Sequence, residues 1–280
     1  MLTLEKTGAR QTYSGLVRPW ECDENEHLNL TFYIRAFQYA SEALAADVLR
    51  ANPGAASASL RHMRFHRELR VSQTFAIDSA VIRGGEHNGR ILHLLRSNGH
   101  ICASALDLPG FSTEKVPVLG VAEVLPSFTR GLSSAPSSMS SSQCDPRTMM
   151  PLNLGVVRPH ELDHVGQLQM HEIFSYCTLA SLHILGDIVG LSPEWKKVSG
   201  CTHMGVEVKI TRHRECKAGD VLSSRSWLAS VGEKSLVLRH CVYDHLGSPV
   251  ASVEQVLVIV DFKERRVVPV PLFVRAYLST

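Results

Sequence analysis

An internal repeat constrains the fold of this chain more than any other feature of its sequence. Residues 15–44 align without gaps on residues 155–184, an offset of 140 in a chain of 280 residues. A second block aligns at an offset of 147, where His66-Arg67-Glu68 matches His213-Arg214-Glu215. Because the repeat unit is about half of the chain, it indicates two domains of similar fold.

A segment rich in Ser, Pro and Gly separates the two copies. It reads SFTRGLSSAPSSMSSSQCDP and has little apolar surface to bury, which is typical of a linker. We therefore expect a first domain over residues 1–126, a Ser-rich linker over 127–150 and a second domain over 151–280.

Within each copy the hydrophobic pattern changes from helical to strand-like. Apolar residues recur at helical spacing over residues 31–50 and 171–188, which predicts one long amphipathic helix per copy. Runs of strand-forming residues, separated by turn residues, follow each helix. They predict strands at 60–71, 74–83, 90–97 and 100–108, and at 203–214, 221–231, 235–244 and 249–261. With one strand before each helix, the prediction is an α+β fold with one curved antiparallel sheet per copy.

Composition and charge exclude several classes of protein. The formal net charge is +2, with 44% hydrophobic and 20% charged residues, so nothing favours a nucleic acid or an anionic membrane as partner. The N-terminus lacks the apolar core of a secretion signal, and no segment approaches the ~20 apolar residues of a membrane span. We expect a cytoplasmic protein. The seven cysteines are widely spaced without a C-x-x-C pair, which favours free thiols over disulfides or structural zinc.

The segment before the first helix reads DENEHLNLTFYI and begins at Asp23. It resembles the D-x-N-x-H-V-N-N-x-x-Y-I segment of acyl-acyl-carrier-protein thioesterases and the D-x-x-G-H-V-N motif of the 4-hydroxybenzoyl-CoA thioesterase family. The resemblance implies two tandem hotdog domains, paired as an intrachain pseudo-dimer, that hydrolyse acyl-CoA or acyl-carrier-protein. It implies no cofactor and no metal, and it leaves further association of copies open.

The resemblance also implies which side chains take part. The carboxylate that opens the family motif is catalytic, which points to Asp23. In the plant-type enzymes the Asn, the His and a downstream Glu also take part, which implies Asn25, His27 and, as a looser match, Glu68. The side chains expected to bind substrate are Asn29, Tyr33, Arg64 and Arg67.

The position of Asp23 suits this chemistry. Thioester hydrolysis needs a carboxylate that attacks or activates water, together with donors for the oxygen that becomes negative. Asp23 precedes a helix whose first N–H groups lack intrahelical partners, so the amides of residues 27–30 are candidates for the oxyanion hole. Asn29 is a candidate N-cap of that helix.

The two copies differ in this segment, and the first departs from the family. Glu26 replaces the family's Gly, and Leu30 replaces its second Asn. The second copy keeps the Asp and the Gly but has Val165, Gln167 and Gln169 where the first has Asn25, His27 and Asn29. We expect one working site and one degenerate site, for which the candidate residues are Asp163, Gly166 and Gln167.

Each assignment has a structural alternative. Asp23 by itself is typical of a helix cap, His27 of a hydrogen-bonded turn, and the run Arg61–Arg70 of a solvated strand face. Strand alternation places Glu68 away from its own helix, within reach only of a site between the two domains. Two other functions remain open. One is a hotdog hydratase or dehydratase acting on the acyl α and β carbons, and the other is a non-catalytic acyl-CoA-binding protein.

Overall fold

The computed structural model describes residues 9–49, 57–120, 131–137 and 147–277. The chain forms two compact units, unit 1 over Met1–Arg130 and unit 2 over Gly131–Thr280.

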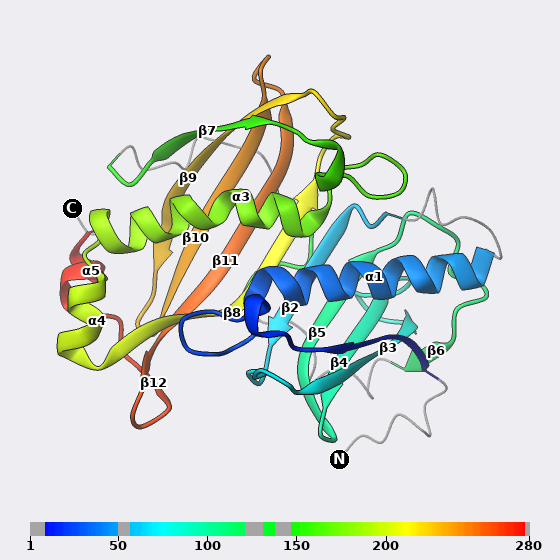
Figure 1. Ribbon diagram of the computed structural model, residues 1–280, viewed down its shortest axis with the longest axis horizontal. Helices are drawn as coiled ribbons and strands as arrows, with labels where there is room; N and C mark the ends of the chain where they lie inside the picture. Colours follow the sequence, from blue (N-terminus) through cyan, green and yellow to red (C-terminus); the bar gives the residue numbers. More distant parts are fainter. Residues whose placement is uncertain (1–8, 50–56, 121–130, 138–146, 278–280) are drawn as a thin grey trace. The chain divides into compact units, whose positions relative to one another are not determined.

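Unit 1 is one sheet with one long helix (Figure 1). In chain order its elements are β1 (Arg10–Leu16), the 3₁₀ helix η2 (Pro19–Glu21), α1 (Leu30–Leu49), β2 (Leu60–Phe65), β3 (Thr74–Arg83), β4 (Ile91–Ser97), β5 (His100–Leu108) and β6 (Val118–Gly120). The strand order is β1-β3-β4-β5-β2, all antiparallel, and β6 pairs in parallel with β3. Helix α1 packs against β1, β3 and β4.

Unit 2 repeats this plan. Its elements are β7 (Met150–Val156), η5 (Pro159–Glu161), α3 (Met170–His183), the π-helical turn η6 (Ile184–Ile188), α4 (Pro193–Ser199), β8 (Cys201–Arg212), β9 (Val221–Val231), β10 (Ser235–Asp244), β11 (Pro249–Asp261), β12 (Arg266–Val268) and α5 (Leu272–Ala276). The order β7-β9-β10-β11-β8 matches that of unit 1 position by position. Helix α3 crosses β9, β10 and β11 (Figure 1).

The predicted elements are confirmed, with one informative exception. The first long helix and seven of the eight predicted strands form within two residues of their expected bounds, and the helix predicted over 171–188 forms as α3 followed by the π-helical turn η6. The strand expected at 60–71 ends at Phe65, because the amides of His66 and Arg67 both donate to the carbonyl of Cys102, at 2.8 and 3.0 Å. Two successive amides on one acceptor cannot continue a regular ladder, so the chain leaves the sheet there. The short elements β6, β12, α4 and α5 were not predicted.

Helix α1 buries the apolar stripe that its spacing predicts. Ile34, Phe37 and Leu44 are fully buried, and Tyr33 is 3% exposed. Burying each such side chain contributes about 1.5–3 kcal/mol, so this face holds the helix on the sheet.

The repeat extends to individual hydrogen bonds in the core. Ser79 Oγ lies 2.6 Å from His93 Nδ1 in unit 1, and Ser226 Oγ lies 2.8 Å from His240 Nδ1 in unit 2. These pairs match at the offset of 147, and all four residues have no exposed surface. The aligned blocks are therefore equivalent in three dimensions as well as in sequence.

The two cores differ beside this pair. In unit 1 the guanidinium of Arg61 donates twice to the carboxylate of Asp107, at 2.8 and 2.6 Å, and once to the carbonyl of Ile34. Arg61 and Asp107 face each other across β2 and β5, and both are buried. In unit 2 the paired positions hold Val208 and Gln255. Unit 1 thus contains a buried ion pair where unit 2 is uncharged.

Part of the expected linker belongs to the packed structure of unit 2. Residues 131–137, here named the strap, lie against β8 and β11. The amides of Gly131 and Leu132 donate to the carboxylate of Glu207 at 2.8 and 3.0 Å. Lys209 Nζ donates to two strap carbonyls at 3.0 and 3.1 Å and pairs with Glu254 at 2.7 Å. Hydrogen bonds to polar groups therefore hold the strap, although its polar composition predicted an unpacked linker.

We expect Lys209→Met to loosen the strap and destabilise unit 2 by about 2–4 kcal/mol, because it removes both bonds to the strap carbonyls and leaves the buried Glu254 carboxylate with fewer partners. The measurements are denaturant unfolding and hydrogen exchange at the amides of Gly131 and Leu132. Lys234→Met, which removes an exposed lysine of the same unit, is the matched control and should change neither.

The structure also bears on the state of the cysteines and on the presence of a membrane-spanning helix. Six cysteines are free thiols, as predicted, and Cys144 lies outside the described residues. In the described ranges no single helix is long and apolar enough to cross a membrane, although Met170–Ile188 with Pro193–Ser199, a bent pair, passes that test by length and composition. The cytoplasmic location stays a prediction.

Candidate active site

Asp23 organises the loop between η2 and α1. Its Oδ1 accepts the amides of Asn25, at 2.8 Å, and His27, at 3.1 Å, while its own amide donates to the carbonyl of His27. Glu26 lies inside this loop with φ of 61°, a left-handed conformation that glycine adopts with less strain. Asp23 is an exposed residue. Asp23 therefore holds a tight turn and presents its carboxylate to solvent.

Unit 2 builds the same turn. Asp163 Oδ1 accepts the amides of Val165, at 3.0 Å, and Gln167, at 2.9 Å. Gly166 takes the left-handed position with φ of 79°. The turn is therefore common to both units, and the two loops differ in the side chains that surround the carboxylate.

The hydrogen bonds at the start of α1 rule out three of the four amides expected to form the oxyanion hole. The N-cap prediction is confirmed, because Asn29 Oδ1 accepts the amide of Thr31 at 3.0 Å. However, the amides of His27, Leu28 and Asn29 already donate to Asp23 Oδ1 and to the carbonyls of Leu69 and Glu21. These three donors are occupied by the protein's own acceptors, and a substrate oxygen would need others.

The structure brings Glu68 to His27 within unit 1. His27 is 6% exposed, and its Nε2 lies 3.2 Å from Glu68 Oε2. The expectation that Glu68 points away from its own helix and reaches only a site between domains is wrong. The alternation of faces ends with the strand at Phe65, and residue 68 lies in the loop that turns back toward the motif.

His27 Nε2 and Glu68 Oε2 are close enough for an ion pair, but the two side chains are not oriented to form a hydrogen bond. We describe this approach as a close electrostatic contact.

Unit 2 replaces this contact with a neutral side chain. Gln167 Nε2 donates to Glu215 Oε1 at 2.8 Å, and Arg212 donates to Gln167 Oε1 at 2.8 Å. Gln167 and Glu215 match His27 and Glu68 in the repeat. The second loop therefore keeps its glutamate and has a neutral amide in place of the imidazole.

The residues expected to bind substrate occupy different environments. Tyr33 is buried, and burial raises the pKa of its phenol, so the group stays protonated at neutral pH. Its hydroxyl accepts the amide of Leu69 at 3.0 Å. Arg67 is exposed near the motif loop and Arg64 is half-buried on β2. Substrate binding by these residues stays a prediction, and the contact of Tyr33 with Leu69 is one that sequence reasoning missed.

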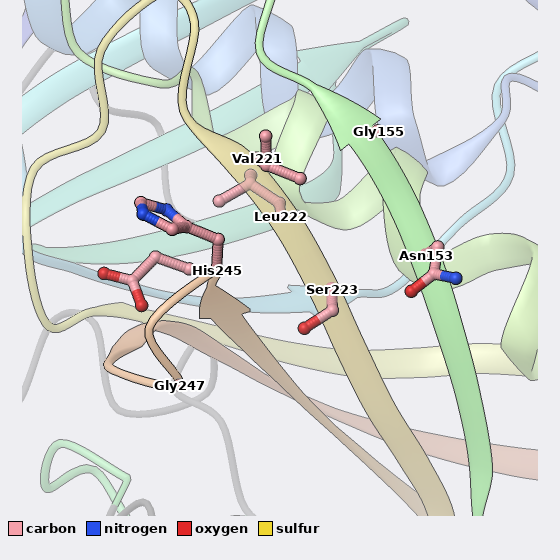
Figure 2. Close-up of a pocket in the computed structure, with 8 residues that line it drawn as sticks. Asn153, Gly155, Val221, Leu222, Ser223, His245 and Gly247 are labelled. Atoms are coloured by element: carbon pink, nitrogen blue, oxygen red, sulfur yellow. The ribbon is translucent and has the colours of Figure 1, made fainter.

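A cavity of about 370 Å³ lies in unit 2, lined by residues of β7, β9 and the turn after β10 (Figure 2). Asn153, Val221, Ser223 and His245 are among its lining residues, and it is widely open to solvent. It contains neither Asp163 nor Gln167. Within the described ranges no group of three or more His, Cys, Asp or Glu side chains is arranged to hold a metal ion.

Comparison with known proteins supports the fold. The 12:0-ACP thioesterase of Umbellularia californica is 15% identical, with a TM-score of 0.60, covering 91% of this chain and 97% of that chain. An acyl-ACP thioesterase of Bacteroides thetaiotaomicron is 12% identical, with a TM-score of 0.60, covering 91% and 100%. At these identities the likeness shows the fold alone. A search of curated proteins gave no significant match.

A family model provides the stronger evidence. The model of the thioesterase-like superfamily matches residues 17–112 and residues 157–278, one segment in each unit. The matched segments cover both loops that carry the Asp and both long helices. Because they span more than half of the chain, the protein belongs to the thioesterase-like superfamily, and it is a thioesterase built from two tandem hotdog domains.

Proposed function

We propose that unit 1 hydrolyses an acyl thioester of CoA or acyl carrier protein, with Asp23 as the base or nucleophile. The observation that carries this proposal is the exposed carboxylate of Asp23, held by two amides beside the His27–Glu68 contact. Both amides bind Oδ1, so Oδ2 is the oxygen proposed to take a proton from water or to attack the thioester carbonyl. The products are a free acid and a thiol.

In this mechanism His27 and Glu68 form the supporting acid–base pair. A histidine beside a carboxylate can donate a proton to the departing thiolate, and the carboxylate stabilises the imidazolium. The burial of His27 supports this role, because a low local dielectric strengthens its interaction with the carboxylate. Asn25, whose amide is fixed by Asp23, is proposed to orient the attacking water.

The oxyanion hole needs donors other than the amides that the protein already uses. We propose the amide of Leu30 at the start of α1 and the side-chain amide of Asn25. The amide of Leu30 lies at the helix N-terminus, where the helix dipole favours negative charge. Loss of one such donor typically costs about 100-fold or more in turnover.

The substrate class is proposed from the solved structures that share the fold. Two are named as ACP thioesterases, which act on an acyl group carried by acyl carrier protein, and CoA is the second carrier proposed. Both carriers present the acyl group on the same phosphopantetheine arm. We also propose that the two hotdog units pair as an intrachain pseudo-dimer, which the near-equal length of the repeats supports.

The test is release of free thiol from a panel of acyl-CoA and acyl-carrier-protein substrates of increasing chain length. We expect the parent to release thiol and His27→Gln to lower turnover by about 100-fold or more. Glutamine is chosen because unit 2 carries it at the matched position, where it hydrogen bonds to the loop glutamate. The substitution should therefore preserve the fold.

The matched control is Gln167→His in unit 2, which we expect to leave turnover unchanged. Acyl-CoA binding without thiol release by the parent would contradict the proposal and favour the non-catalytic alternative. Hydration of an enoyl-CoA without thiol release would favour the hydratase alternative.

A further inference from the structure

The hydroxyl of Tyr33 is bonded to the loop that carries Glu68. Tyr33 lies in the first turn of α1, and its oxygen accepts the amide of Leu69 at 3.0 Å. The same oxygen lies 3.5 Å from the carbonyl of Arg67, to which it donates. The ring packs edge-on against Phe65 with centroids 5.3 Å apart. One buried side chain thus contacts the residues on both sides of Glu68.

Other bonds hold the same loop at its two ends. At the start, the amides of His66 and Arg67 donate to the carbonyl of Cys102. At the end, the carbonyl of Leu69 accepts the amide of Leu28 at 2.8 Å, which joins the loop to the motif segment. Between these ends the Tyr33 hydroxyl fixes the backbone that presents Glu68 to His27.

Unit 2 forms the first of these attachments without a tyrosine. Ile173 occupies the position that matches Tyr33. The amides of His213 and Arg214 still donate to the carbonyl of Val250, as their counterparts do in unit 1. A hydroxyl is therefore not required for the loop to leave the sheet at this point. In unit 2 the loop glutamate is held directly by a hydrogen bond from Gln167.

From this contrast we infer that Tyr33 is a positioning residue, which holds the Glu68 carboxylate at His27 through the backbone of the 66–69 loop. The inference rests on the proposed function, because it assigns Tyr33 to the His27–Glu68 pair of that site. The hydroxyl acts both as acceptor and donor, and phenylalanine would keep the ring packing while losing both bonds. Small displacements of a catalytic group are costly, since a shift of about 1 Å can lower rates by about 100-fold.

The experiment is a double-mutant cycle on turnover with Tyr33→Phe, Glu68→Gln and the double variant. We expect Tyr33→Phe to lower kcat by roughly 10-fold to 100-fold with KM nearly unchanged. In the Glu68→Gln background the same substitution should have little further effect, because the group that it positions is already gone. Tyr39→Phe, which removes a half-exposed hydroxyl from the same helix, should leave kcat unchanged.

Independent, multiplicative effects of the two substitutions would overturn the inference, as would an unchanged kcat in Tyr33→Phe. Loss of activity in Glu68→Gln together with full activity in Tyr33→Phe would refute the positioning role and leave the proposed function intact. A Glu68→Gln variant with full activity would instead remove Glu68 from the proposed mechanism.

Hydrogen exchange provides a readout that does not depend on activity. The amide of Leu69 should exchange at least about 10-fold faster in Tyr33→Phe than in the parent, because its acceptor is lost. The amide of Asn25, which donates to Asp23, should be unaffected. Unchanged protection at Leu69 would show that the hydroxyl does not hold the loop, and would overturn the inference even if the parent hydrolysed no thioester.

Discussion

Replacement of Asp23 by asparagine is expected to remove thioester hydrolysis while leaving the fold intact. Asparagine retains an Oδ1 that can accept the amides of Asn25 and His27, so the turn should form. It cannot act as a base or as a carboxylate nucleophile, and such groups contribute about 100-fold to 10,000-fold. The measurement is thiol release under saturating substrate, with circular dichroism and the melting temperature as checks on the fold.

Asp163→Asn is the internal control for this experiment. Asp163 makes the same two amide bonds in unit 2, but Val165 and Gln167 stand where unit 1 has Asn and His. We expect this variant to keep the activity of the parent. Equal losses in both variants would mean either that unit 2 holds a second working site or that the turn itself is what activity requires. Full activity in Asp23→Asn would refute the catalytic assignment.

The second large effect is expected in the core of unit 1, where Arg61→Val should destabilise the protein by about 3–5 kcal/mol. The substitution leaves the buried Asp107 carboxylate without the guanidinium that bonds both of its oxygens. For a domain of this size such a loss lowers the melting temperature by about 10 °C or more. Scanning calorimetry of the intact chain measures it.

The double variant Arg61→Val with Asp107→Gln tests the physical reason. It gives unit 1 the residues that unit 2 carries at the paired positions, Val208 and Gln255. Removing both charges avoids an unpaired buried ion, so the double variant should recover at least half of the lost stability. A double variant as unstable as the sum of the two single variants would show that the charges themselves are not the cause.

Asp107 in unit 1 and Glu254 in unit 2, two buried carboxylates, predict how acid affects stability. Burial alone raises the pKa of Asp107, but the charge and hydrogen bonds of Arg61, with a smaller contribution from His93, outweigh it and leave the pKa lowered. Burial likewise raises the pKa of Glu254, and bonds from Lys209, Ser137 and Arg239 lower it to about 2. A lowered carboxyl pKa stabilises the fold above the unfolded value of about 4 and loses this effect as the pH falls toward the folded pKa. Both pairs therefore make the protein less stable in acid.

Much of the fold could be predicted because periodicity is a local property of the chain. Apolar residues at helical spacing predict the starts of both long helices to within one residue, and runs of strand-forming residues between turn residues predict the bounds of β9, β10 and β11. The cap at Asn29 was also predictable, since it involves a contact only two residues along the chain. The repeat required only the comparison of the chain with itself.

The candidate site was predictable in its residue types but not in its contacts. Asp23, Asn25 and His27 lie within one short loop, whose turn follows from their order. The meeting of His27 with Glu68 depends on where β2 ends, and the register of the sheet against Cys102 decides that. The polar–apolar pattern does not reveal where the strand ends, because polar and apolar residues continue to alternate beyond Phe65.

The sequence by itself determined two repeated units, their long helices and most of their long strands, and the loop that carries Asp23, because each of these depends on patterns along the chain. The tertiary structure alone decided which amides at the start of α1 are occupied, how Tyr33 holds the 66–69 loop, and where the Arg61 charge is neutralised. It also decided that the strap is packed on β8 and β11. Each of these depends on partners that lie 36 to 76 residues apart along the chain, or on acceptors in neighbouring loops, and no local pattern encodes that proximity.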